Sequence, residues 1–121
     1  MTARELANEL EKFLADQLGE YSWSGGFKRP AVNVGTPAAD VSVSGLEVII
    51  DVDPEYANVP LNAHTAIIRE LPVRFIPHDG AEAMVAIERV MARWLTSSPS
   101  TIPADERLGI GKQYVLRVRS S

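Results

Sequence analysis

The residues of this sequence best suited to chemistry are three acidic side chains and a histidine near its middle. Asp51 and Asp53 end an apolar segment, Glu55 follows, and His64 comes after a short interval. Residues two apart on a strand share a face, so Asp51 and Asp53 can offer two carboxylates to one Mg²⁺ or Ca²⁺. A small metal-dependent hydrolase would use Asp51, Asp53 and His64. We favour a plain strand end and turn instead, because Asp53-Pro54 is a common turn opener and the spacing of a calcium loop is missing.

Other catalytic chemistry has little support in the sequence. The chain has no cysteine, which excludes disulfides, thiolate metal sites and a thiol nucleophile. No Gly-x-Ser-x-Gly segment is present to expose a serine, and His64 and His78 both stand beside predicted strand ends. Gly109-Ile110-Gly111 lacks the further glycines and the helix of a phosphate-binding loop, so we interpret it as a turn. We therefore expect no enzyme activity, no catalytic residue, no metal site and no cofactor.

Three aromatic residues could stack nucleic-acid bases, namely Trp23, Phe27 and Trp94. Trp94 falls on the predicted inner side of a helix, which favours packing. Trp23 precedes Gly25 and Gly26, and it is either an exposed anchor for a protein partner or a core side chain.

Composition indicates one globular domain spanning residues 1–121, with 45% hydrophobic and 23% charged residues. The apolar runs are too short to span a membrane, and residues 1–20 lack the pattern of a signal peptide. The net charge is −4, so the basic surface that usually binds nucleic acid is missing. We expect neither a membrane partner nor recognition of a nucleic-acid sequence.

Charge is distributed unevenly along the chain. The acidic middle comprises Asp40, Glu47, Asp51, Asp53 and Glu55. The basic end comprises Arg107, Lys112, Arg117 and Arg119. Two patches of opposite sign suit a subunit that binds copies of itself head to tail, although many monomers show the same asymmetry.

The first predicted element is an amphipathic helix that begins at a capping box, Thr2 with Glu5, and ends at Gly19. Its predicted inner residues are Leu6, Leu10, Phe13, Leu14 and Leu18.

Strands are predicted at residues 31–34 and 41–43, and then at 46–52 and 64–76 around a long loop at residues 53–63. The last two should form an antiparallel hairpin. Glu47 and Asp51 should face away from the core, and Pro72 should place its strand at a sheet edge or mark a bulge.

A second helix should begin at a cap formed by Asp79 with Glu82, and a final strand should follow at residues 113–119. The predicted buried stripe of this helix is Met84, Ile87, Met91, Trp94 and Leu95. The sequence thus predicts an α+β fold, with an antiparallel or mixed sheet and two helices on one face, in the order helix, strands, helix, strand.

In element order the sequence resembles the tail terminator (gpU-like minor tail) proteins of long-tailed bacteriophages. The resemblance spans nearly the whole chain. It rests on the segments ELANELEKFLADQL, RPAVNVG, GLEVIIDVDPE, AIIRELPVRFI and QYVLRVR. Other head–tail joining and neck proteins share this outline, and no single motif separates them.

The resemblance implies a structural virion protein, assembled in the host cytoplasm, that forms a hexameric ring. Such a ring caps the tail tube, ends its polymerisation and presents a surface to the head connector. The acidic and basic patches would supply the contacts between copies, and Tyr56, Asn58 and Asn62 in the long loop would reach a neighbour or the tube. A monomeric adaptor that binds a peptide at the sheet edge containing Pro72 is the alternative from another class.

Overall fold

The computed structural model of the chain describes residues 1–59 and 70–119. Its helices are α1 (Ala3–Phe13) and α2 (Met84–Arg93), with short 3-10 helices η1 (Pro54–Tyr56) and η2 (Glu106–Leu108). Its strands are β1 (Glu20–Ser22), β2 (Lys28–Pro30), β3 (Val32–Val34), β4 (Ser42–Ser44), β5 (Leu46–Ile50), β6 (Glu70–Pro77), β7 (Ser100–Ile102) and β8 (Gln113–Arg119). The predicted α+β class is confirmed.

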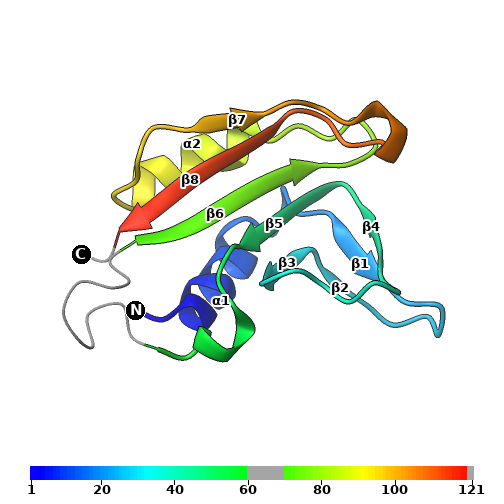
Figure 1. The fold of residues 1–121 in the computed structure, drawn as a ribbon, viewed down its shortest axis with the longest axis horizontal. Coiled ribbons are helices and arrows are strands. Elements are labelled where there is room, and N and C mark those ends of the chain that lie inside the picture. Colours follow the sequence, from blue (N-terminus) through cyan, green and yellow to red (C-terminus); the bar gives the residue numbers. More distant parts are fainter. Residues whose placement is uncertain (60–69, 120–121) are drawn as a thin grey trace.

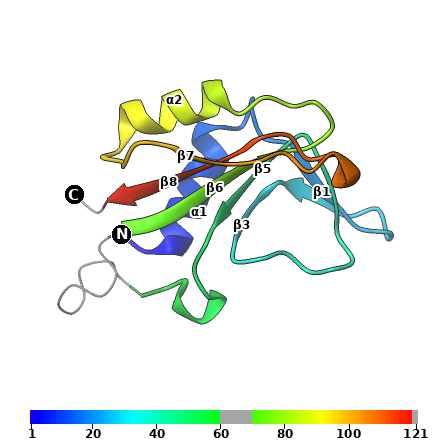
Figure 2. The same cartoon turned by 45° about the horizontal axis from the view of Figure 1, so that its top comes forward.

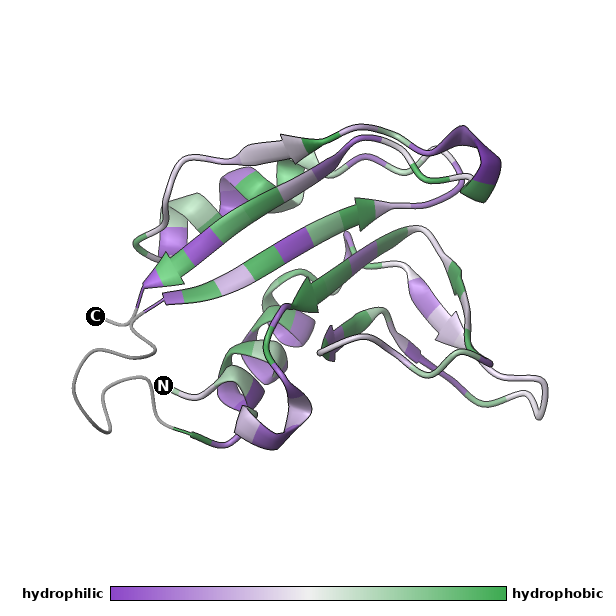
Figure 3. Cartoon of the chain, in the orientation of Figure 1, coloured by the Kyte–Doolittle hydropathy of each residue, from purple (hydrophilic) through white to green (hydrophobic). Residues whose placement is uncertain are grey.

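The larger sheet has five strands in the order β3-β5-β6-β8-β7. β3 runs parallel to β5, and the other neighbours are antiparallel, so the sheet is mixed. The predicted antiparallel pairing of the strands at residues 46–52 and 64–76 is confirmed for β5 and β6, with Leu46 opposite Pro77 and Ile50 opposite Val73. Residues 60–69, which belong to the predicted loop and to the start of the second strand, lie outside the described residues. In Figure 3, β6 and β8 alternate between hydrophobic and hydrophilic residues, as expected for strands with one face in the core.

The predicted edge position of Pro72 is wrong, because β6 is paired on both sides. The Pro72 carbonyl accepts a hydrogen bond from the Asp51 N–H at 2.8 Å. The N and C=O groups of one strand residue point to the same side, so the nitrogen of Pro72 also faces β5. β5 ends at Ile50, opposite Val73, and the missing N–H therefore falls just beyond the paired residues of β5.

Both helices pack on one face of the five-stranded sheet, as predicted. Leu6, Leu10 and Leu14 from the α1 region share one core with Ile87 and Val90 of α2 and with the inward residues of β5, β6 and β8. The helices also touch each other, since the rings of Phe13 and Trp94 meet edge to face with centroids 5.5 Å apart. Figure 1 shows α2 behind β8 and α1 next to β5.

A second, three-stranded sheet in the order β2-β1-β4 was not predicted as such. It leaves the main sheet at the start of β5, where two glycines bring backbones into close contact. The Gly19 N–H donates to the Leu46 carbonyl at 2.7 Å, and a Cβ built on Gly19 would lie 1.8 Å from the Ser44 carbonyl oxygen. Gly19 is therefore needed for this close approach, and not as the stop of the first helix.

The helix boundaries differ from those predicted. α1 ends at Phe13, and residues 14–17 form turns, so Leu18 lies beyond the helix. α2 begins at Met84, and the residue before it, Ala83, makes no side-chain cap. Asp79 instead adopts a positive φ of 53° in a turn with Gly80, a conformation that asparagine and aspartate tolerate better than most residues.

The free edges of the five-stranded sheet, β3 and β7, are both short, with three residues each. The carbonyl of Val32 faces away from β5 and accepts a hydrogen bond from Arg29 at 2.8 Å. The Asn33 side-chain amide lies along the same edge, 3.4 Å from the Val34 carbonyl and 2.8 Å from the Gly35 carbonyl. β7 lies between Pro99 and Pro103, which have no N–H to donate.

Candidate interaction surfaces

The acidic residues that we weighed as a metal site, and interpreted as a strand end and turn, have separate partners. Asp51 pairs with Arg74, with Oδ1 3.1 Å from Nη2. Asp53 caps the 3-10 helix η1 by accepting from the Glu55 N–H at 3.2 Å, which confirms the turn interpretation. His64 lies outside the described residues. Within residues 1–59 and 70–119, no group of three histidine, aspartate or glutamate side chains is arranged to hold a metal ion.

Two of the predicted contact residues are paired within the chain, and the four predicted cations do not form one patch. Asp51 is bound to Arg74, and Arg119 forms an ion pair with Glu70 at 3.0 Å. Arg107 and Lys112 lie before β8, whereas Arg117 and Arg119 lie at its far end. Seven strand residues extend over about 23 Å, so the four cations do not gather at one place.

The remaining predicted contact residues are exposed where they are described. This group comprises Asp40, Asp53, Glu55, Tyr56, Asn58, Arg107, Lys112 and Arg117. Asn62 lies outside the described residues.

The prediction that Glu47 faces a neighbouring subunit is wrong. Glu47 points away from the helices, as predicted, but its residue is only 4% exposed. Its Oε2 accepts a hydrogen bond from the Tyr21 hydroxyl at 2.6 Å, and its Oε1 lies 2.9 Å from Nε2 of His78. The three-stranded sheet therefore covers this part of the second face. A buried carboxylate with two partners joins the two sheets, and it is not free to bind another chain.

The network changes the ionisation of Tyr21. Burial raises the pKa of its hydroxyl above the usual range, and the hydrogen bond to Glu47 raises it further by placing a carboxylate beside the would-be phenolate. Tyr21 therefore remains a hydrogen-bond donor over the whole physiological pH range. Sequence reasoning missed this network, because Tyr21 and Glu47 are 26 residues apart and nothing local marks them as partners.

The β1–β2 hairpin carries an aromatic cluster that leads outward from this network. The rings of Tyr21 and Trp23 meet at 6.4 Å, and those of Trp23 and Phe27 at 5.2 Å. The Arg29 guanidinium lies over Tyr21 at 4.8 Å and over Trp23 at 5.8 Å. Trp23 is half-buried, whereas Phe27 at the tip is 63% exposed. Trp23 is thus neither a core side chain nor a fully exposed anchor. Phe27, which packs against it, is the aromatic residue that is free to act as an anchor.

The outward surface of α2 is unusually apolar. The predicted buried stripe is only partly right, because Ile87 is buried and Trp94 packs on the core. The exposed members are Met84 at 45%, Met91 at 41% and Leu95 at 65%, joined by Val85 at 45%. The buried side of the helix is formed by Ala86, Ile87 and Val90. Scattered apolar residues on a surface are ordinary, but a contiguous patch of them often marks an interaction site.

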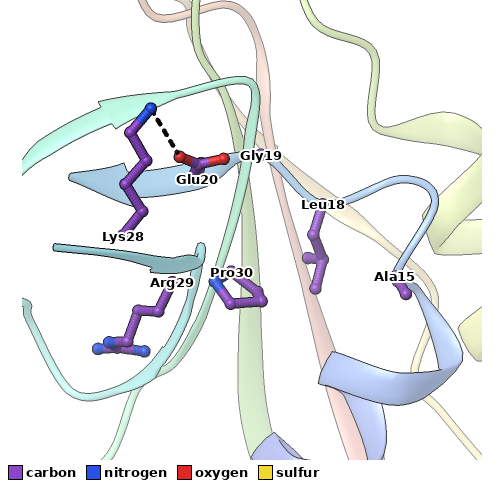
Figure 4. Close-up of a pocket in the computed structure, with 7 residues that line it drawn as sticks. All are labelled: Ala15, Leu18, Gly19, Glu20, Lys28, Arg29 and Pro30. Atoms are coloured by element: carbon purple, nitrogen blue, oxygen red, sulfur yellow. Dashed lines mark ion pairs between the residues drawn. The ribbon is translucent and has the colours of Figure 1, made fainter. Parts of the chain in front are cut away.

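A shallow cavity of about 320 Å³ lies where the chain passes from α1 to the three-stranded sheet (Figure 4). Lys28 and Glu20 form an exposed ion pair across it at 3.6 Å. A second hollow of about 110 Å³ lies between α1 and β3, and Arg29 lines both. The guanidinium of Arg29 is already engaged by the Val32 carbonyl and by Asn33, so neither hollow offers it to a ligand.

Over the residues that the structure describes, neither helix has the length and hydropathy needed to cross a bilayer. Comparison with known proteins adds no relative: no family model, no curated protein and no solved structure matches this chain.

Proposed function

We propose that this chain is a structural subunit of a phage tail or neck that assembles with copies of itself. Its role would be that of the tail terminator proteins, which its sequence resembles. A ring of subunits would cap the tail tube, end its polymerisation and present a surface to the head connector. The partners are then further copies of the chain, the tube protein and the neck proteins.

The observation that carries this proposal is the outward surface of α2. Four large apolar side chains, Met84, Val85, Met91 and Leu95, are each 41–65% exposed within a stretch of twelve residues. Burying them would remove a substantial apolar area from water, at roughly 25 cal/mol for each Å². Contacts between permanently associated subunits are more hydrophobic than transient ones, and these four side chains suit such a contact.

The charged residues that the sequence suggested as subunit contacts are less suited to that role. Asp51 and Arg119 have partners within the chain, and Glu47 is buried. The contact between copies should therefore be mainly apolar. Apolar association is not screened by salt, whereas exposed ion pairs are.

Light scattering after size-exclusion chromatography, at low and at high salt, tests the proposal. We expect an assembly of about six times the 13.2 kDa chain mass that persists at high salt, and ring-shaped particles in electron micrographs. A ring of another size would favour a different head–tail joining protein. A monomer at every salt and protein concentration would contradict self-assembly.

A further inference from the structure

Two exposed apolar features lie at opposite ends of the molecule. One is the tip of the β1–β2 hairpin, residues 23–28, which we term the hairpin tip. The other is the α2 surface described above, formed by Met84, Val85 and Met91 of α2 and by Leu95, which follows the end of the helix. Figures 1 and 2 both place the hairpin tip and α2 toward opposite ends of the molecule. The tip of one molecule therefore cannot reach α2 of the same molecule.

The hairpin tip presents Phe27 on a firm support. The Trp23 N–H donates to the Phe27 carbonyl at 3.0 Å, and the Gly26 N–H donates to the Trp23 carbonyl at 2.9 Å. The Phe27 ring also packs against the Trp23 ring, and the Arg29 guanidinium lies 5.8 Å from the centre of that Trp23 ring. Gly25 and Gly26 have no neighbour within 4 Å of a built Cβ, so a partner surface can approach Phe27 closely. An aromatic anchor held in one conformation loses little entropy when it binds.

The α2 surface fits a ring of this kind. Met84 and Met91 are seven residues apart, which places them on the same side of the helix two turns apart. Methionine side chains are flexible and polarisable, and they make favourable contacts with aromatic rings.

The charges beside these two features are complementary. Glu88 is exposed and stands between Met84 and Met91 in the sequence of α2. The two arginines of the helix, Arg89 and Arg93, are paired with Asp16 and Glu9 of the first helix region. Lys28 directly follows Phe27, and its present partner, Glu20, is 3.6 Å away in an exposed pair. Such pairs contribute little, so Lys28 can exchange Glu20 for another carboxylate at small cost.

We propose that the hairpin tip of one copy binds the α2 surface of the next copy, with Phe27 between Met84, Met91 and Leu95, and with Lys28 paired to Glu88. This inference rests on the proposed self-assembly and names its contact. Each copy would use one patch toward one neighbour and a different patch toward the other. Such head-to-tail contacts close into a ring when the rotation between copies allows it.

Two surface variants and their mixture test the contact. Phe27→Ser removes the anchor and keeps the α2 surface. Leu95→Glu disrupts the α2 surface and keeps the anchor. Both side chains are more than 60% exposed, so both variants should fold. Each variant alone should be monomeric, with the contact weakened about 30-fold or more, as for a central anchor residue. An equimolar mixture should give a dimer of one copy of each and nothing larger, because one intact contact remains.

A charge exchange provides the second test. Lys28→Glu and Glu88→Lys should each weaken assembly, and the double variant should restore it. Circular dichroism shows that each variant is folded. If wild-type chain assembles and Phe27→Ser assembles equally well, the contact is wrong while self-assembly stands. If Leu95→Glu disrupts assembly and Phe27→Ser does not, the α2 surfaces of two copies pair with each other and the proposal fails. If wild-type chain never assembles, the contact and the proposed function both fail.

Discussion

The hydroxyl of Tyr21 lies 2.6 Å from Oε2 of Glu47, and this hydrogen bond fastens the three-stranded sheet to the five-stranded sheet. Both residues are almost fully buried, Tyr21 at 0% and Glu47 at 4% exposure. A buried carboxylate is costly unless its oxygens are hydrogen-bonded. The stability of the contact between the two sheets should therefore depend on Tyr21 more than its size alone suggests.

Replacing Tyr21 with phenylalanine should destabilise the protein by about 1–3 kcal/mol, because Oε2 of Glu47 then loses its donor in a site without water access. The free energy of unfolding from urea titration measures this effect. Tyr56→Phe is the matched control, since Tyr56 is 48% exposed and its loss should change stability by no more than about 0.5 kcal/mol. Equal effects of the two substitutions would mean that the Tyr21 bond adds nothing.

Alkaline titration should detect the same network by absorbance. The pKa of Tyr21 is raised by burial and by Glu47, so its ionisation is unfavourable in the folded state. The contribution of the neutral Tyr21 to the free energy of unfolding is fully present below about pH 10, which is the pKa of a tyrosine in an unfolded chain. It is lost as the pH rises above that value. The phenolate absorbance of Tyr21, obtained by subtracting the titration of Tyr21→Phe, should rise only with unfolding. A rise in the folded protein would contradict the buried position.

The loss of stability at acid pH should reflect the contact between Asp16, after the first helix, and Arg89 of α2. Arg89 donates two hydrogen bonds to Asp16, at 2.7 and 3.0 Å, and they lower the pKa of Asp16 to about 2. Because the folded pKa is lowered, the stabilisation is present above about pH 3.9 and disappears as the pH falls toward 2. Carboxyl carbon NMR should give a pKa near 2.

Arg89→Met should return the pKa of Asp16 toward its ordinary value. Arg93→Met is the control, because Arg93 pairs with Glu9 at 3.8 Å and not with Asp16. An Asp16 pKa that is unchanged by Arg89→Met would show that the ion pair does not form in solution.

The close approach at Gly19 can be tested with a pair of alanine substitutions. Gly19→Ala would place a methyl group 1.8 Å from the Ser44 carbonyl oxygen and 2.7 Å from the Gly45 Cα, so backbone must move. We expect a loss of about 3 kcal/mol or more, at the upper end for overpacking. Gly25→Ala meets open space and does not require a positive φ, so it should be within about 0.5 kcal/mol of wild type. The midpoints of thermal unfolding of the two variants measure this difference. Equal midpoints would show that the close approach at Gly19 does not limit the side chain there.

The fold was predictable where the pattern is local. Leu46, Val48 and Ile50 recur at strand spacing, and Leu6, Leu10 and Leu14 recur at helical spacing. Each set predicted one core face, and all six residues lie in the core. The three-stranded sheet was not predictable in the same way. Its strands have three residues each, and β1 pairs with β4 across a long stretch of sequence. Such short strands carry too little periodicity to identify their partners.

The candidate surfaces show why periodicity alone could not assign the inner side of α2. Met84 and Met91 recur at helical spacing, and so do Ala83, Ile87 and Val90. With apolar residues on both sides, the sequence does not tell which side meets the sheet. Packing favours the side with Ala83 and Ala86, because small residues let the helix lie close to the strands. Glu47 was misjudged for a related reason, since its partner Tyr21 belongs to a distant segment.

The short edges at β3 and β7 have a consequence for how the protein behaves before assembly. An open strand edge is a template on which a second molecule can add its own strand, and repeated additions lead to fibres. Here the Val32 carbonyl is already bound by Arg29, and Pro99 and Pro103 flank β7. Addition of a second molecule's strand at these two edges is therefore disfavoured.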